Sequence, residues 1–197
     1  MPSRKPYHHG RLREALLEAA IPLVAEVGPA GFTLREVARR AGVSHNAPYR
    51  HFQDKDALLA AVAAQGFREL AEEMHQAAAA AQPTPLDRLK GSGLAYVAFA
   101  LRRPAHFTVM FDAPMARGRH RELAESSQRA FGALAGFIQD CQKAGQLPPG
   151  FSQERTLYAW SLVHGIAKLA IAGRLPYRSK AAILKFARFV IDQSLPA

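Results

Sequence analysis

His45 and Asn46 carry side chains that can reach the edges of DNA bases from the exposed start of a short helix expected over residues 44–52. Asparagine suits this chemistry because its amide can form two hydrogen bonds with adenine. The preceding helix is expected to begin near Leu34 and to end at Gly42, so only a short turn separates the two. Helix, short glycine-containing turn and helix is the order of a helix-turn-helix, in which the last helix enters the major groove.

The start of each of these two helices can be assigned to capping residues. Thr33 and Glu36 form a capping box, in which the threonine oxygen and the glutamate side chain satisfy free backbone donors. Ser44 can cap the following helix, although Pro48 complicates this because proline lacks the N–H that would bond back to Ser44. Asn46 is the alternative cap, and the exact start of this helix stays open between the two.

Apolar residues recur at intervals of three and four positions along almost every segment, which indicates helices. Glycine and proline mark the ends of these segments, as at Gly28-Pro29. The sequence predicts an all-α fold of about nine helices, without a convincing strand. The helices are expected over residues 10–27, 34–41, 44–52, 55–80, 86–101, 104–111, from 123 to a stop at Gly145, 152–172 and 179–194. We expect a helix-turn-helix domain over residues 1–60 and a second helical domain over 61–197.

The composition favours a globular protein with an anionic partner. The 197 residues are 49% hydrophobic and 21% charged, which provides enough apolar surface for a core. A net charge of +10 suits either nucleic acid or an acidic membrane surface, but no helix combines a wide apolar face with a solid Lys/Arg face. No membrane partner is therefore expected. With a single cysteine, Cys141, expected as a small buried hydrophobe, and no signal peptide or transmembrane segment expected, we expect a cytoplasmic protein.

Several short motifs of residues 7–60 resemble the DNA-binding domain of TetR-family transcriptional regulators. They are Tyr7-His8-His9-Gly10, Phe32-Thr33-Leu34-Arg35-Glu36-Val37-Ala38, Ala41-Gly42-Val43-Ser44, Tyr49-Arg50-His51-Phe52 and Lys55-Asp56-Ala57-Leu58-Leu59. Two later segments, 103–111 and 160–165, resemble one subgroup of the family's C-terminal regulatory domains. The resemblance implies a homodimer whose C-terminal domain dimerises through its last two helices and binds a small ligand inside.

The resemblance implies that residues 45–51 form the recognition helix and that Thr33, Tyr49, His51 and Lys55 contact the DNA backbone. A phenol, an imidazole, an ammonium and a capped helix N-terminus can all donate hydrogen bonds to phosphate. The expected DNA-binding residues are Thr33, Ser44, His45, Asn46, Tyr49, Arg50, His51 and Lys55. For His45, Asn46 and Arg50, the alternative is a solvated polar residue on a small helix. Phe52 is expected in the core.

The residues before the first helix are expected to form an arm that contacts phosphate or the minor groove through Arg4, Lys5, His8 and His9. The alternative is a disordered tail. Two adjacent histidines without a nearby cysteine or carboxylate cluster make a poor metal site. No metal site and no cofactor are expected.

The small-molecule site is expected to be a mostly apolar cavity with a few polar groups. Its expected lining residues are Phe67, Met74, Tyr96, Phe99, His106, Phe107, Met110, Phe111, Phe131, Trp160 and His164. Tyr96 and His164 are the strongest candidates for polar ligand contacts because they are polar groups in apolar helices. His106 is the next candidate. For any one of these residues the alternative is a place in the core, since a stripe of Phe or Met at helical spacing is usually core.

The helix over residues 152–172 is apolar nearly all round, so one protomer cannot cover its whole circumference. A second subunit would supply the missing cover, and the helix over 179–194 offers a matching apolar face. The expected dimer interface comprises Ile166, Ile171, Ile183, Phe186 and Val190. Lys168 and Lys185 interrupt these stripes and are expected at the rim or in solvent.

Enzyme signatures such as a Gly-rich phosphate loop, a nucleophile elbow or a His-x-x-x-His pair are not found in the sequence, so no enzyme is expected. The expected function is a ligand-responsive transcriptional regulator. By the family's usual behaviour it would be a repressor that a small molecule releases from a palindromic operator in double-stranded DNA. The helix from Lys55 is expected to transmit ligand binding to the DNA-binding domain. The alternatives are a DNA-binding dimer without ligand control and an all-helical small-molecule carrier or enzyme.

Overall fold

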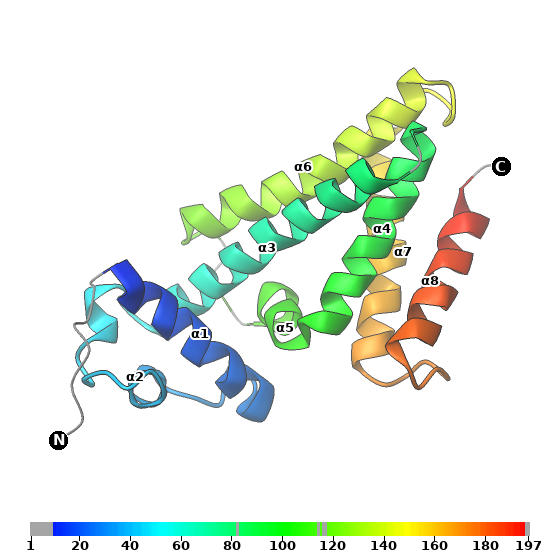
Figure 1. Ribbon diagram of the computed structural model, residues 1–197. Helices are drawn as coiled ribbons and strands as arrows, with labels where there is room; N and C mark the ends of the chain where they lie inside the picture. Colours follow the sequence, from blue (N-terminus) through cyan, green and yellow to red (C-terminus); the bar gives the residue numbers. More distant parts are fainter. Residues whose placement is uncertain (1–9, 82, 114, 116–117, 196–197) are drawn as a thin grey trace. The chain divides into compact units, whose positions relative to one another are not determined.

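The computed structural model describes residues 10–81, 83–113, 115 and 118–195. Figure 1 shows helices joined by short loops, and the described residues form eight α-helices, one 3-10 helix and no strand. The elements in chain order are α1 (Gly10–Val27), α2 (Leu34–Arg40), η1 (Pro48–Arg50), α3 (Lys55–Ala80), α4 (Pro85–Arg102), α5 (Pro104–Asp112), α6 (Arg121–Lys143), α7 (Ser152–Ile171) and α8 (Lys180–Ser194). The all-α prediction is confirmed, and eight of the expected helices begin and end within a few residues of their predicted bounds.

The chain folds into two compact units. The first comprises residues up to Gln65 together with Ala105–Ala124, and the second comprises Gly66–Pro104 together with the residues from Glu125 on. α3 therefore contributes its first part to one unit and its remainder to the other. The sequence places a boundary at residue 60, whereas α5 and the segment after it fold with the first unit although they are distant in sequence. The assignment of DNA-binding and regulatory roles to the two units stays a prediction.

The first unit has a core built from one face of each of its helices. Leu16 of α1, Val37 of α2 and Leu58 of α3 are fully buried, and the apolar spacing of each helix places its other core residues on the same face. α1 packs against α2, and Phe107 of α5 belongs to the same buried set. Phe52 is 3% exposed, which confirms the expectation that it is a core residue rather than a DNA contact.

In the second unit α4 packs against both α7 and α8, as Figure 1 shows. Gly93 permits this close approach, because a Cβ atom at this position would lie 3.4 Å from Ile191 Cδ1 and 3.5 Å from Val163 Cγ1. Cys141 of α6 is fully buried, and burial raises the pKa of its thiol to about 11. The thiol is therefore a small apolar core group at neutral pH, as expected.

Candidate functional site

The start of α2 is fixed by the predicted capping box. Thr33 Oγ1 accepts a hydrogen bond from Glu36 N at 3.3 Å, while the Glu36 carboxylate accepts from Thr33 N at 2.7 Å and from Thr33 Oγ1 at 2.9 Å. The hydrogen bonds that Thr33 donates from its side chain and its backbone lower the pKa of Glu36 below its usual value. Because the Thr33 hydroxyl proton is already used, backbone N–H groups of the first turn are what this end of α2 can offer to a phosphate.

The turn after α2 is closed by Gly42, which has the left-handed conformation (φ 69°) that glycine adopts without strain. Val43 N donates to Ala38 O at 3.0 Å and completes the end of the helix. Arg40 binds the Glu26 carboxylate through two hydrogen bonds of 2.7 and 2.8 Å, which join α2 to α1. These contacts fix the direction in which the chain continues after α2.

The predicted α-helix over residues 44–52 is wrong, because the structure has a turn followed by the three-residue 3-10 helix η1. Pro48 has no N–H, so Ser44 O instead accepts from Ala47 N at 2.9 Å. His51 N and Phe52 N both donate to Pro48 O at 2.9 Å and close a single tight turn. Neither proposed cap is correct, since Ala47 is the N-cap residue of η1 and makes no side-chain capping bond.

This short segment combines a buried anchor with an exposed polar surface. Ala47 and Pro48 are buried and hold the segment against the first unit. The side chains on either side of this anchor are exposed: Ser44, His45, Asn46, Tyr49, Arg50 and His51. Tyr49 is 53% exposed, which leaves its phenol open to a ligand. The structure thus brings six of the eight expected DNA-binding residues together on one exposed segment.

Thr33 and Lys55 are the two expected DNA-binding residues outside this segment. Lys55 makes contacts that could not be predicted from the sequence. Its Nζ donates to Ala30 O at 2.8 Å and lies 5.3 Å from the centre of the Phe32 ring. These contacts hold the ammonium against the loop before α2. Two of its N–H groups remain for a phosphate, so Lys55 has both a structural contact and the chemistry expected of it.

The sequence analysis did not predict a group of ion pairs that forms at the start of α3. Asp54 caps α3 by accepting from Ala57 N at 2.8 Å, and this bond, more than its 2.8 Å contact with Arg119, lowers the pKa of Asp54. His120 Nε2 lies 2.9 Å from Asp56 Oδ2. The cap was readable from the sequence, but the long-range partners were not.

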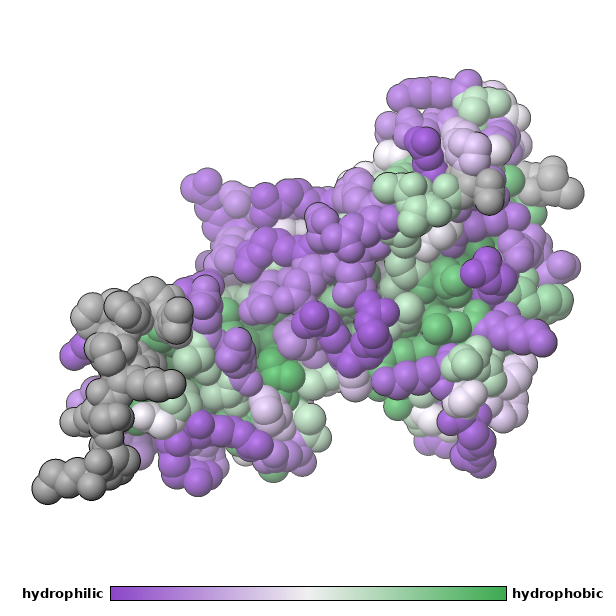
Figure 2. Space-filling model, viewed as in Figure 1, coloured by the Kyte–Doolittle hydropathy of each residue, from purple (hydrophilic) through white to green (hydrophobic). Residues whose placement is uncertain are grey.

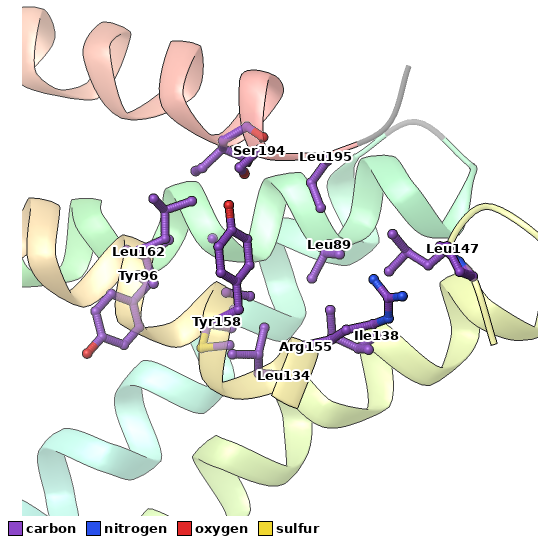
Figure 3. Close-up of a pocket in the computed structure, with 16 residues that line it drawn as sticks. Leu89, Tyr96, Leu134, Ile138, Leu147, Arg155, Tyr158, Leu162, Ser194 and Leu195 are labelled. Atoms are coloured by element: carbon purple, nitrogen blue, oxygen red, sulfur yellow. Dashed lines mark hydrogen bonds between the residues drawn. The ribbon is translucent and has the colours of Figure 1, made fainter. Parts of the chain in front are cut away.

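The second unit contains a cavity of about 300 Å³, shown in Figure 3. Residues of α3, α4, α6, α7, the end of α8 and the adjoining loops line it. The lining residues are Met74, Leu89, Gly93, Tyr96, Leu134, Ile138, Leu147, Pro148, Arg155, Tyr158, Ala159, Leu162, Val163, Ile191, Ser194 and Leu195. Of the eleven expected ligand-binding residues, Met74 and Tyr96 line this cavity.

The other nine expected ligand-binding residues lie elsewhere. Phe99 is fully buried core, and Phe131 is 36% exposed on α6. Four fold with the first unit, where Phe107 and Met110 are buried. These four are His106, Phe107, Met110 and Phe111, and the remaining three are Phe67, Trp160 and His164. None of the nine lines this cavity, because aromatic content alone does not distinguish a packed helix face from a hollow one. Their assignment to a ligand site stays a prediction.

Tyr96, Trp160 and His164 form a polar network beside the cavity. Trp160 Nε1 donates to Tyr96 Oη at 3.2 Å, and the Tyr96 hydroxyl is hydrogen-bonded to His164 Nδ1 at 2.8 Å. Burial raises the pKa of Tyr96, so it remains a neutral phenol. The network explains why three polar groups are tolerated in apolar helices, since each buried group has a partner.

Arg155, Tyr158 and Ser194 are polar lining residues that the sequence interpretation missed. Arg155 and Tyr158 lie on α7, which was interpreted as apolar nearly all round, and Ser194 ends α8. Figure 3 shows the Arg155 guanidinium beside Ile138 and Leu147. A cationic residue within an apolar helix could have identified this position from the sequence.

Two of the expected dimer-interface residues are buried within their own protomer. Ile166 and Ile183 are 6% and 8% exposed because these faces of α7 and α8 belong to the core of the second unit, and their assignment to the interface stays a prediction. Ile171, Phe186 and Val190 are half-buried. The large apolar side chains that α7 and α8 do expose are Leu157, Tyr158, Leu169 and Phe189.

A separate open hollow of about 820 Å³ lies along α3, α4 and α8. Figure 2 shows apolar surface over α4 and α8 with hydrophilic residues at its edges. Four of its charged residues form two ion pairs, Lys90 with Asp192 at 3.0 Å and Arg102 with Glu73. This hollow therefore differs from the 300 Å³ cavity, whose arginine has no carboxylate beside it in the part of the chain that the structure describes.

Within residues 10–81, 83–113, 115 and 118–195, no group of three or more His, Cys, Asp or Glu could hold a metal ion. None of the helices in that part of the chain is long and apolar enough to cross a membrane. Arg4, Lys5, His8 and His9 of the expected N-terminal arm lie outside the described residues.

The all-helical fold with an N-terminal helix-turn-helix unit and a helical unit that contains a cavity defines a class of DNA-binding regulatory proteins. Residues 16–62 match the model of "Bacterial regulatory proteins, tetR family", and residues 89–193 match "Tetracyclin repressor-like, C-terminal domain". The chain therefore belongs to the TetR family of transcriptional regulators, which are not enzymes.

Individual proteins agree with this assignment. A Rhodococcus sp. RHA1 protein of unknown function is 33% identical, with a TM-score of 0.84 over 98% of this chain and 100% of that one. Bacillus subtilis FadR in complex with stearoyl-CoA shares the fold at 14% identity, with a TM-score of 0.75 over 92% of this chain and 97% of that one. The Mycobacterium tuberculosis HTH-type transcriptional repressor Rv3405c is 41% identical over 59 residues, which are 30% of this chain and 31% of that protein. The chain thus matches about a third of the length of this curated relative.

Proposed function

We propose that the protein is a ligand-responsive repressor that binds a palindromic operator as a homodimer and leaves it when a small molecule enters the second unit. The observation that carries this proposal is the combination of an exposed polar segment, residues 44–51, with an apolar cavity in a separate unit. The name of the M. tuberculosis relative, a repressor, and the stearoyl-CoA bound to the B. subtilis fold neighbour support the two halves of the proposal.

Homodimerisation is part of the proposal because α7 and α8 expose large apolar side chains. Phe189 is 60% exposed and Leu169 is 49% exposed. A second copy of the chain would cover these side chains and place two DNA-binding units on one duplex. We expect the operator to have two half-sites separated by about one helical turn, roughly 34 Å, or a multiple of it.

Control by a ligand requires only that the ligand and the operator favour different arrangements of the same dimer. α3 is the proposed transmitter because it starts beside the DNA-binding segment at Lys55 and contributes Met74 to the cavity wall. The segment Ala105–Ala124 is a second connection, since it folds with the first unit while both of its flanks belong to the second. A ligand that shifts either element would change the operator affinity.

The proposal is tested by selecting operator sequences with the purified protein and then measuring their binding with and without small molecules that stabilise the protein. We expect a two-fold symmetric footprint and at least one stabilising molecule that lowers operator affinity. If every stabilising molecule left operator affinity unchanged, the second candidate, a DNA-binding dimer without ligand control, would replace the proposal.

Substitutions on the exposed segment should separate backbone contacts from base contacts. Tyr49→Phe should weaken binding to every sequence about tenfold, because it removes a donor to a charged phosphate while keeping the ring. Asn46→Ala should relax the preference at one operator position by about 1 to 3 kcal/mol. Gel shifts on the selected operator and its single-base variants measure both effects.

Gln153→Ala is the matched control for these two variants, since Gln153 is an exposed polar residue of α7 in the second unit. It should bind every duplex like the wild type. If Asn46→Ala weakened all duplexes equally, as Tyr49→Phe should, Asn46 would be a backbone contact and its base-reading role would be rejected.

A further inference from the structure

We propose that the 300 Å³ cavity binds an amphiphilic carboxylate, a small molecule with an apolar tail, and that Arg155 pairs with its carboxylate group. This inference rests on the proposed function, because the molecule would be the effector of the repressor. It adds the chemical class of the effector and the residue that recognises it.

The residues that line the cavity indicate that most of the bound ligand is apolar. Four of the sixteen lining residues carry polar side chains, namely Tyr96, Arg155, Tyr158 and Ser194. The others are apolar, and they come from five helices and from the residues that follow α6 and α8. A wall of this kind stabilises hydrocarbon by removing it from water, so most of the occupant has to be apolar.

Among the described residues that line the cavity, Arg155 alone is charged at neutral pH, so it determines the polar part of the molecule. Arg155 is half-buried as a residue, and its guanidinium lies beside Ile138 and Leu147 (Figure 3). Within the described residues, Arg155 Nε donates to Gly150 O at 3.4 Å, and no carboxylate of those residues lies within ion-pair distance of the guanidinium. The two terminal nitrogens of the guanidinium are therefore left for another partner.

Other arginines of the same unit show the contrast. Arg102 pairs with Glu73, and Arg103 pairs with Glu69 at 2.7 Å. Arg155 has no such carboxylate partner among the described residues, so its terminal N–H groups can bind an anion at the cavity wall without first breaking an ion pair. The planar fork of arginine matches a carboxylate through two parallel hydrogen bonds, which favours a carboxylate over a neutral polar group.

Tyr96 does not compete for this role. Its hydroxyl is hydrogen-bonded to His164 Nδ1 and accepts from Trp160 Nε1, so it fixes one wall of the cavity rather than offering a free donor. Tyr158 and Ser194 are the remaining polar groups. In Figure 3 the Tyr158 hydroxyl points toward α8 near Ser194, away from the Arg155 guanidinium. The carboxylate site is thus at Arg155, and the tail extends along the apolar wall.

The volume limits the size of the molecule. A group the size of a water molecule takes about 30 Å³ in a liquid, so a cavity of 300 Å³ holds on the order of ten non-hydrogen atoms. A medium-chain fatty acid such as octanoate has this size. Longer chains would have to extend through the opening or enlarge the cavity.

The test uses the full-length dimeric protein and isothermal titration with hexanoate, octanoate, decanoate, dodecanoate and neutral octan-1-ol. Octanoate or decanoate should bind most tightly of the acids, and octanoate should bind about 10 to 100 times more tightly than octan-1-ol because of the charge-assisted hydrogen bonds. Equal affinity for octanoate and octan-1-ol would overturn the inference.

Arg155→Met isolates the charge, because methionine keeps the length and the apolar stem. It should weaken octanoate binding at least about tenfold while leaving octan-1-ol binding unchanged, and that unchanged binding shows that the cavity is still folded. Arg155→Lys keeps the positive charge but loses the planar guanidinium, so its octanoate affinity should lie between those of the wild type and Arg155→Met. Arg129→Met is the matched control, since Arg129 is an exposed α6 residue that does not line the cavity. Unchanged octanoate affinity in Arg155→Met would overturn the inference.

The same samples separate this inference from the proposed function. If octanoate binds through Arg155 but operator affinity does not change, the ligand class is correct and induction by this ligand is rejected. If another stabilising molecule releases the operator while no carboxylate binds, the proposed function stands and the inference about Arg155 fails.

Discussion

Replacing Phe189 by glutamate is expected to convert the proposed dimer into monomers and to lower operator affinity by about 10³ or more. Phe189 is 60% exposed on α8, and Leu169 is 49% exposed on α7, which packs against α8. A carboxylate at position 189 would have to be buried without a partner if two such faces met, which costs several kcal/mol for each subunit. A monomer can contact only one half-site, so most of the specific affinity is lost.

Light scattering at micromolar concentration and gel shifts on the selected operator check the two parts of this prediction. Phe131→Glu is the matched control, because Phe131 is also an exposed phenylalanine of the second unit but lies on α6. The control should remain dimeric and bind the operator normally. A Phe189→Glu protein that stayed dimeric would show that the subunits meet through another face.

The helices could be predicted from the sequence because each has an apolar stripe and recognisable ends. The capping box of Thr33 and Glu36 and the left-handed Gly42 are local features, and the structure contains both. The same local reasoning failed over residues 44–52, because it weighed two capping side chains against Pro48. The missing N–H of Pro48 has the larger effect, since no side-chain cap can replace a backbone bond inside a helical turn.

The faces of α7 and α8 could not be assigned from the sequence. A helix that is apolar on most sides has no preferred core face by periodicity, so Ile166 and Ile183 looked equivalent to residues that are now seen to be exposed. The choice depends on long-range packing, in which Gly93 lets α4 come close to Val163 of α7 and Ile191 of α8. This contact is not visible in any local pattern.

The cavity lining was the least predictable part of the candidate site. The cavity is the space that five packed helices leave unfilled, whereas aromatic residues expected to line it can fill space in the core instead, as Phe99 does. The sequence singled out Tyr96 and His164 as polar groups in apolar helices. In the structure these two side chains are hydrogen-bonded to each other, and Trp160 donates to Tyr96. Arg155 offered the clearest local indication and was overlooked within an apolar helix.

Phe99→Ala is expected to lower the free energy of unfolding by about 3 to 5 kcal/mol. Phe99 is fully buried on α4, where it fills space in the core of the second unit without lining the cavity. Removing its ring loses its burial and leaves a hole that the surrounding helices fill only in part. Because Phe99 does not touch the cavity, the loss should be the same with and without a saturating ligand.

Urea unfolding at a fixed protomer concentration measures this loss, since the stability of a dimer depends on concentration. Phe131→Ala provides the comparison, because Phe131 is 36% exposed and its truncation leaves no enclosed hole, so its effect should be small. If Phe99→Ala left stability unchanged but abolished the binding of a ligand, Phe99 would be a ligand contact after all. That outcome would mean that the cavity widens toward α4 when it is occupied.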